Sequence, residues 1–186
     1  AIEAMRTLKR QGDTLIIHTI RGDRPQHVED WLRHFGIPYD EVVKVTAPTV
    51  LTSFSGLSSS NSGFIPPDPV IAAGPDHIVQ VVNSVVQIYD KLGNVLQTAN
   101  LSSWFFSVWR GSSPFDPKVV YDQLDDRWIL LTVARNTTNQ TSNYLISVSQ
   151  TNDPTGSWLV YGLNAELNGS GVTNFWADYP GLGYDR

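Results

Sequence analysis

The stretch FDPKVVYDQLDDRWILLTVAR, residues 115–135, decides the fold class. In it, two runs rich in β-branched and aromatic residues are joined by the short polar turn of residues 124–126. Two such runs separated by turn-forming residues predict an antiparallel β-hairpin. Similar runs and turns continue outward on both sides, from Pro69 to Asn164. The sequence therefore predicts consecutive antiparallel strands, which is a β-meander.

Seven strands can be placed from these runs. Their expected ranges are 77–83, 85–90, 95–100, 118–123, 127–135, 144–150 and 157–164. Four strands joined by tight turns form one blade of a β-propeller, and the chain supplies about two such blades. Trp128 and Trp158 fall within strands, so we expect both to fill the packing between sheets. We expect the aromatic segment SSWFFSVW, residues 102–109, to be largely buried between the blades.

Composition divides the chain into two unlike parts. Residues 1–48 hold seven Lys or Arg and seven Asp or Glu, whereas residues 49–186 hold six and eleven. Residues 49–68 are rich in Ser, Gly and Pro, which is typical of a linker or of an extended segment that follows the surface. We expect an α/β segment at 1–48, a linker at 49–68 and propeller-like blades at 69–186. The fold class is therefore mixed and mainly β.

Charge and residue usage exclude several classes of function. The formal net charge of −5 argues against a nucleic-acid-binding protein, because phosphate contacts need a basic surface. No apolar run approaches the roughly 20 residues of a membrane-spanning helix. The chain has no cysteine, which excludes disulfides, thiolate nucleophiles and Cys-ligated metal sites.

The first 48 residues alternate helix and strand. TLIIHT, residues 14–19, and EVVKV, residues 41–45, read as strands. A helix should begin at Pro25 and end before Gly36. Apolar residues share one face of it, namely Val28, Trp31, Leu32 and Phe35. An earlier helix should present Ile2, Met5 and Leu8 on one face. This order implies parallel strands and a short Rossmann-like segment.

AMRTLKRQGDTLIIHTIRGDRPQHVEDWLRHFGIPYDEVV, residues 4–43, resembles the middle of a haloacid-dehalogenase-superfamily phosphatase. The resemblance implies that the Thr19 hydroxyl holds a transferred phosphoryl group. Lys44 lies near the place of the family's conserved lysine, although the usual Lys-Pro context is absent. Thr19 and Lys44 are thus the candidate phosphate contacts. The family also uses Mg²⁺, which this chain would bind only if the phosphatase interpretation holds.

The nucleophile motif of that family is missing. The family uses an Asp nucleophile and a second Asp two residues later, on a strand that precedes the first helix. The only similar string, IYDKLGN, has Asp90 but carries Leu92 in place of the second acid, and it reads better as a β-turn. We therefore expect the α/β segment to be non-catalytic, and the chain not to be an enzyme.

Residues 65–186 resemble a family of bacterial extracellular β-propeller proteins. The resemblance is carried by PPDPVIAAGPDHIVQVVNSVVQIYDKLGNVL, FDPKVVYDQLDDRWILL, SVSQTNDPTGSW and ADYPGLGYD. The last string looks like the start of another blade. A propeller needs about four to eight blades to close, so we expect a fragment of a longer protein, one of several chains that complete the ring, or a meander that folds into a different small β-structure. The join of two unlike halves also fits a product assembled from separate pieces. The partners would be copies of this chain or other chains that complete the propeller.

Two further groups of residues are candidates for ligand binding. Asp122, Asp125 and Asp126 are calcium candidates, although Asp side chains also cap turns. The tryptophans are numerous enough to suggest stacking on carbohydrate. TNDPTGSW resembles the Asp-box turn of sialidase-type propellers, which implies a structural role for Asp153 and Trp158.

Three functions follow from these observations. The first is a non-catalytic binding or assembly module of propeller type, located outside the cell or on its surface. The second is a phosphatase-related protein with an incomplete active site, which would be cytoplasmic. The third is a sugar-binding propeller built from several chains.

Overall fold

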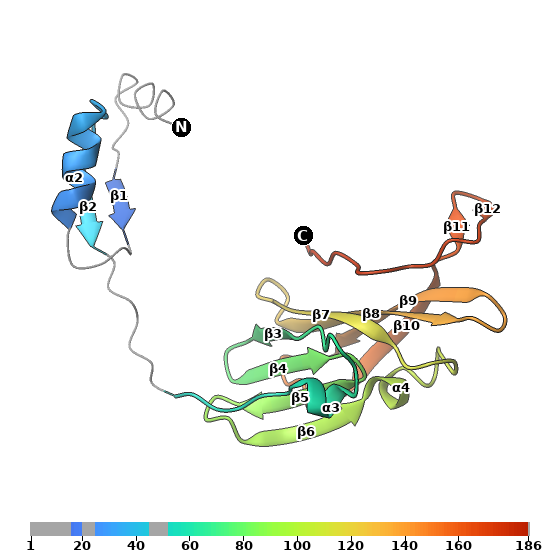
Figure 1. Cartoon of the computed structure of the whole chain (residues 1–186). Helices are drawn as coiled ribbons and strands as arrows, with labels where there is room; N and C mark the ends of the chain where they lie inside the picture. The colour runs from blue at the N-terminus through green and yellow to red at the C-terminus, as the bar shows by residue number, and fades with distance from the viewer. Residues whose placement is uncertain (1–15, 20–24, 45–51, 186) are drawn as a thin grey trace. The chain divides into compact units, whose positions relative to one another are not determined.

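The computed structural model describes residues 16–19, 25–44 and 52–185. The chain divides into two compact units, Ala1–Leu51 and Thr52–Arg186, each of which is described here by itself. Strand accounts for 41% of the structure and helix for 10%, so the protein is mainly β, as the sequence predicts (Figure 1).

The first unit contains one β–α–β element. Strand β1 (Ile16–Thr19) and strand β2 (Glu41–Lys44) pair in parallel, and helix α2 (Pro25–His34) connects them. The predicted second helix and both strands are thus confirmed. The predicted helix with Ile2, Met5 and Leu8 lies outside the described residues. A Rossmann-like sheet is not supported, because the described part of this unit has two strands only.

Helix α2 buries less of its apolar face than its spacing predicts. Leu32 is buried, but Trp31 and Phe35 are 48% and 42% exposed. Their rings contact each other instead, with centroids 5.0 Å apart. Gly36 has a φ of 57°, the left-handed conformation that favours glycine after a helix end.

The second unit is built on two antiparallel four-stranded sheets, each a meander with its strands in chain order. The first sheet contains β3 (Val70–Ala73), β4 (His77–Val82), β5 (Val85–Asp90) and β6 (Val95–Asn100). The second sheet contains β7 (Phe115–Asp122), β8 (Arg127–Asn136), β9 (Thr141–Ser149) and β10 (Trp158–Asn164). All seven predicted strands are present, and β3 is an additional one.

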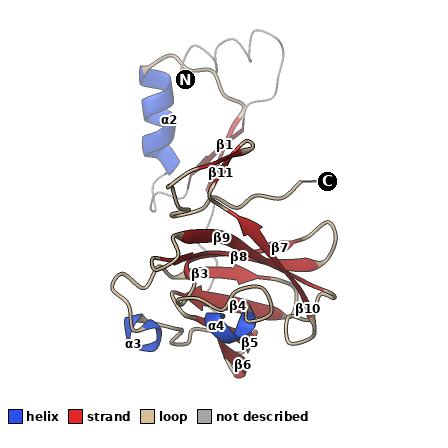
Figure 2. Cartoon of the chain, turned by 90° about the vertical axis from the view of Figure 1, so that its right-hand side faces the viewer, coloured by secondary structure: helices blue, strands red, loops and turns tan. Residues whose placement is uncertain are grey.

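Short elements surround the two sheets. Helix α3 (Ser59–Ser62) precedes the first sheet, helix α4 (Leu101–Trp104) connects the sheets, and the hairpin of β11 (Leu167–Asn168) and β12 (Gly171–Val172) follows the second. The sheets form two layers, one over the other, as Figures 1 and 2 show.

A single apolar core lies between the two sheets. It combines residues of both sheets with Leu101, Phe105 and Trp109 from α4 and the segment after it. Trp128 on β8 is fully buried at its centre, and its indole Nε1 donates to the Asn152 carbonyl at 2.9 Å. Gly74 lies so close that an added Cβ would be 2.7 Å from the Trp128 ring. The predicted packing of Trp128 is confirmed, whereas Phe106 of the aromatic segment is 58% exposed.

The outer face of the first sheet is covered in part by residues 52–62, while Ile71 at its edge is 61% exposed. The Leu57 N–H donates to Gln80 Oε1 at 2.7 Å, and Gln80 Nε2 donates back to the Leu57 carbonyl. The Phe54 ring contacts the Tyr89 ring at 5.1 Å. Leu57 also packs with Val82 and Val85. These residues are therefore an extended segment on the surface of the sheet, which is one of the two alternatives that composition left open.

The outer face of the second sheet, called here the open face, has an uncovered apolar part. Side chains alternate between the faces of a strand, and the register places on this face the residues that the core does not use. The apolar side chains of this face that keep some exposure are Val120, Ile129, Tyr144, Ile146, Val148, Leu159, Tyr161 and Leu163, whereas Leu131 and Val133 on the same face are buried. On β10 alone, Leu159, Tyr161 and Leu163 are 47–52% exposed. The second sheet is thus apolar on both faces.

Replacing Trp128 by Ala should destabilise the protein by about 3–5 kcal/mol, because the change opens a large cavity in the shared core. Urea unfolding measures this difference. The matched control is Leu92→Ala in an exposed turn, which should change stability by less than about 0.5 kcal/mol. Equal effects of the two substitutions would contradict the placement of Trp128.

Candidate binding site

A short motif is repeated at three places in the second unit. Asp68-Pro69 precedes β3, Asp116-Pro117 lies at the start of β7, and Asp178-Tyr179-Pro180 follows the second sheet. After the proline, KVVYD of β7 matches GLGYD at residues 181–185. Asp68, Asp116 and Tyr179 all have positive φ angles, of 49°, 51° and 41°. The first two segments each lead into a four-stranded sheet, and the third shares with them the Asp, the Pro and a residue of positive φ.

Hydrogen bonds join the first two repeats through Asn83, at the β4–β5 turn. Its side-chain amide donates to Asp68 Oδ2 at 2.7 Å and to the Pro66 carbonyl at 3.1 Å. Its Oδ1 accepts the Asp116 N–H at 2.8 Å. The buried Asn83 side chain therefore fixes the start of β7 against the segment that leads into β3.

Asp116 connects in the same way to the third repeat. Its Oδ2 accepts the Tyr179 N–H at 2.9 Å. Burial raises the pKa of the Asp116 carboxyl, and hydrogen bonding with the Asp178 and Asp68 carboxyl groups raises this pKa further, whereas the Tyr179 N–H lowers it. Burial beside two other carboxyl groups therefore favours the protonated form of Asp116.

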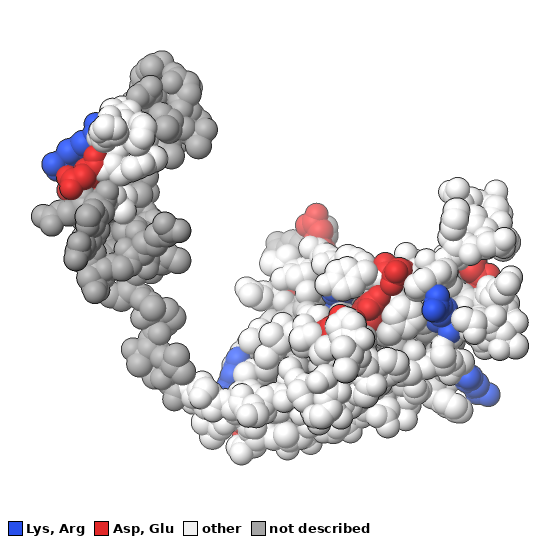
Figure 3. Space-filling view, in the orientation of Figure 1, with Lys and Arg blue, Asp and Glu red and all other residues white. Residues whose placement is uncertain are grey.

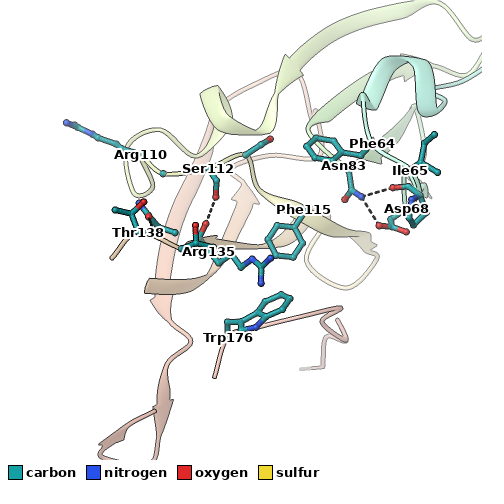
Figure 4. A pocket seen from close by; sticks show the side chains of 15 residues that line it. Phe64, Ile65, Asp68, Asn83, Arg110, Ser112, Phe115, Arg135, Thr138 and Trp176 are labelled. Atoms are coloured by element: carbon teal, nitrogen blue, oxygen red, sulfur yellow. Dashed lines mark hydrogen bonds between the residues drawn. The ribbon is translucent and has the colours of Figure 1, made fainter. Parts of the chain in front are cut away.

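A pocket of about 730 Å³ lies beside these motifs (Figure 4). The segments that surround it are the approach to β3, the β4–β5 turn, the approach to β7, the β8–β9 turn and Trp176. Its volume is in the range of small-molecule sites. A second pocket of about 320 Å³ shares Arg135 and Trp176 with it, so that the two adjoin.

Two arginines line the main pocket, and each guanidinium lies on an aromatic ring. Arg135 is 3.9 Å from the Trp176 ring centroid, and Arg110 is 4.9 Å from that of Phe106. The Phe115 ring meets Trp176 edge to face at 6.1 Å. Stacking fixes the plane of a guanidinium and leaves its N–H groups free at the edge.

The predicted phosphate contacts lie in the first unit. Thr19 and Lys44 are partners in the parallel ladder, each at the last residue of its strand. The structure thus brings these two backbone positions together at the carboxyl edge of the β–α–β element, where α/β folds bind ligands. The phosphate-binding role itself stays a prediction.

The predicted calcium candidates stabilise the β7–β8 turn. Asp122 Oδ1 accepts the N–H groups of Leu124 and Asp125 at 2.8 and 3.4 Å. Asp126 Oδ1 accepts the Tyr121 hydroxyl at 2.9 Å, and Arg127 bonds the carbonyls of Asp125 and Asp126. Within the residues that the structure describes, no group of three or more His, Asp or Glu side chains is arranged to hold a metal ion.

Two other predicted turns have the expected contacts. Asp153 Oδ1 accepts both the N–H and the hydroxyl of Thr155, and Trp158 Nε1 donates to the Pro154 carbonyl at 2.9 Å. Asp90 Oδ1 accepts the N–H groups of Leu92 and Asn94, which confirms a turn at IYDKLGN.

Comparison with protein families, with curated proteins and with solved structures finds no match. None of the helices in the described part of the chain has the length and apolar character that crossing a membrane requires.

Replacing Asp116 by Asn should increase stability relative to the wild type as the pH rises from about 4 to 7. The raised pKa means that the folded protein keeps a proton that the unfolded chain releases, so the wild type loses stability across this range. Asn keeps a hydrogen-bond acceptor for the Tyr179 N–H and does not titrate. Urea unfolding at the two pH values measures the difference.

Asp90→Asn is the control with the opposite sign. Hydrogen bonding with Asn94 lowers the pKa of Asp90, so this carboxylate stabilises the fold at neutral pH and stops doing so as the pH falls through its folded-state pKa. The Asn variant should therefore lose stability relative to the wild type as the pH rises to about 4, and the difference should stay constant from about 4 to 7. A pH-independent effect of Asp116→Asn between about pH 4 and 7 would contradict the raised pKa of Asp116.

Proposed function

We propose that the second unit is a non-catalytic β-propeller-type binding and assembly module. In this proposal the open face of one copy packs against the open face of a second copy. The observation that carries the proposal is the apolar outer surface of the β7–β10 sheet. The extracellular or cell-surface setting is part of the proposal and rests on the sequence resemblance alone.

The order of strands supports the propeller type. Each sheet is a four-stranded meander, and the first strand of the second sheet contacts β3 and β4 of the first sheet. Neighbouring blades of a propeller meet in this way, with their first strands closest to a common axis. The third repeat starts against the open face, because Lys118 lies 3.8 Å from the Tyr179 ring centroid.

The open face has the composition of a sheet-packing surface. It holds eight partly exposed apolar side chains, with Arg127 and Arg135 near the two ends of β8. Lys118, in the middle of β7, also lies on this face, where it contacts the Tyr179 ring. Monomeric proteins rarely expose a contiguous apolar patch of this kind. Figure 3 shows how few charges the visible surface of this unit carries.

A second copy is the partner that matches this face. Apolar sheet faces pack on one another at about 10 Å, as the two sheets of this unit already do. The outer face of the first sheet is partly covered by residues 52–62, which bond to Gln80, so a partner could reach the centre of that face only by displacing them. The self-complementary arrangement therefore joins two open faces about a twofold axis.

A phosphatase-related protein is the second candidate. It rests on the placement of Thr19 opposite Lys44 at the ends of parallel strands. The one string that resembles a nucleophile motif forms the turn around Asp90, in the other unit, which weakens this candidate.

Light scattering over a concentration series tests the assembly. The wild type should shift toward twice the monomer mass as concentration rises, and the double variant Leu159→Lys/Tyr161→Lys should stay monomeric. Both side chains are about half exposed, so the change places charge on the interface without opening the core.

Ile71→Lys is the matched control, because Ile71 is an exposed strand residue of the first sheet. It should associate like the wild type. A wild type that stays monomeric at millimolar concentration, or a double variant that associates equally well, would refute the proposal.

A further inference from the structure

The arginines of the main pocket lack the acidic partners that arginines usually have in folded proteins. In the described part of the chain, neither Arg110 nor Arg135 forms an ion pair with a carboxylate. Both guanidinium groups are instead held on aromatic rings, Arg110 over Phe106 and Arg135 over Trp176. Arg135 faces the pocket, and Arg110 lies at its rim with its guanidinium directed outward (Figure 4). Together they offer an anion two oriented cations, one inside the pocket and one at its edge, in a chain whose net charge is negative.

We propose that this pocket binds an acidic oligosaccharide, in which Arg135 and Arg110 pair with the carboxylates of uronic acid units. This inference rests on the proposed binding role of the module but not on its assembly through the open face.

The rest of the lining favours a sugar over a simple anion. Phe64, Phe115 and Trp176 supply aromatic surface, and Trp176 is 42% exposed. Ser and Thr hydroxyls and the Asn136 amide also line the pocket. Aromatic rings pack on the C–H face of a sugar, while hydroxyl and amide groups exchange hydrogen bonds with its hydroxyls.

The adjoining pocket favours a chain of sugars over a single ring. The two pockets meet at Arg135 and Trp176, so one ligand can pass from one to the other across this stacked pair. The Arg135–Trp176 pair then lies at the centre of the ligand, and Arg110 lies at the far side of the larger pocket.

The site is largely formed before a ligand arrives. Trp109 Nε1 donates to the Ser112 carbonyl at 2.8 Å, and the Ser112 hydroxyl donates to the Arg135 carbonyl. Asn136 Oδ1 accepts the Thr138 N–H at 2.9 Å within the β8–β9 turn. Loops fixed in this way lose little entropy on binding.

Asp68 does not cancel the positive charge. It is the one acidic residue among those lining the pocket. Its carboxylate accepts a hydrogen bond from the Asn83 side-chain amide and lies beside the Asp116 carboxyl. The Asp68 carboxylate is therefore directed toward these two buried residues beneath the pocket.

Calorimetric titration of the full chain with an oligogalacturonate tests the inference. We expect saturable binding that weakens at least about tenfold in Arg135→Gln and in Arg110→Gln, because each change removes a charge-assisted pair. Lys91→Gln removes the same charge at an exposed turn away from the pocket and should change affinity by less than about twofold. The methyl-esterified oligosaccharide, which keeps the rings but lacks the carboxylates, should bind at least about tenfold more weakly.

Four results would overturn the inference. These are the absence of saturable binding, equal binding of the ester, equal weakening by Lys91→Gln, and inorganic phosphate binding as tightly as the oligosaccharide. Titrating the Leu159→Lys/Tyr161→Lys variant separates this inference from the assembly. Unchanged sugar binding by a variant that no longer associates would support the pocket independently, whereas sugar binding lost with association would contradict it.

Discussion

The second sheet has to bury two apolar faces, and this constraint organises the whole unit. Its inner face is covered by the first sheet, with Trp128 at the centre of the shared core. Its outer face keeps half-exposed Leu159, Tyr161 and Leu163 on β10. The first sheet differs, because Gln80, Gln87 and Tyr89 form a hydrogen-bonded polar group on its outer face, beneath residues 52–62. The centre of the first sheet's outer face is therefore covered by the chain itself, whereas β10 on the outer face of the second sheet stays half exposed.

The repeated Asp-Pro segments explain why a pocket lies where the two sheets meet. Each segment contains a residue of positive φ. Asn83 joins the first segment to the second by hydrogen bonds, and Asp116 joins the second segment to the third. These polar groups are buried and fully bonded, so they fix the spacing of the sheets at one end. The loops that carry Arg110 and Arg135 surround the pocket beside these polar groups. The hydrogen-bonded polar groups on one side of the pocket and the aromatic residues that line it thus both lie next to the Asp-Pro segments.

The sequence predicts the local structure well, because strand alternation and turn residues act over short distances. It predicts the meander and the burial of Trp128 from such local patterns, and the structural role of Asp153 from the resemblance of its turn to the Asp box. It does not predict the packing of Leu57 on Gln80 or the stacking of Arg135 on Trp176, which join residues 23 or more positions apart. The exposure of Trp31 shows that spacing defines a face but not what covers it. The Asp-Pro repeat can be found in the sequence and could have pointed to the site. Its third copy is harder to recognise, because Tyr179 stands between the Asp and the Pro.

Amide NMR spectra recorded over a concentration series test the central claim most directly, because they identify the surface that packs. The account predicts shifts and line broadening for residues of β8, β9 and β10 whose side chains lie on the open face, with residues 52–62 unchanged. Changes confined to residues 52–62, or spectra independent of concentration up to the millimolar range, would contradict it.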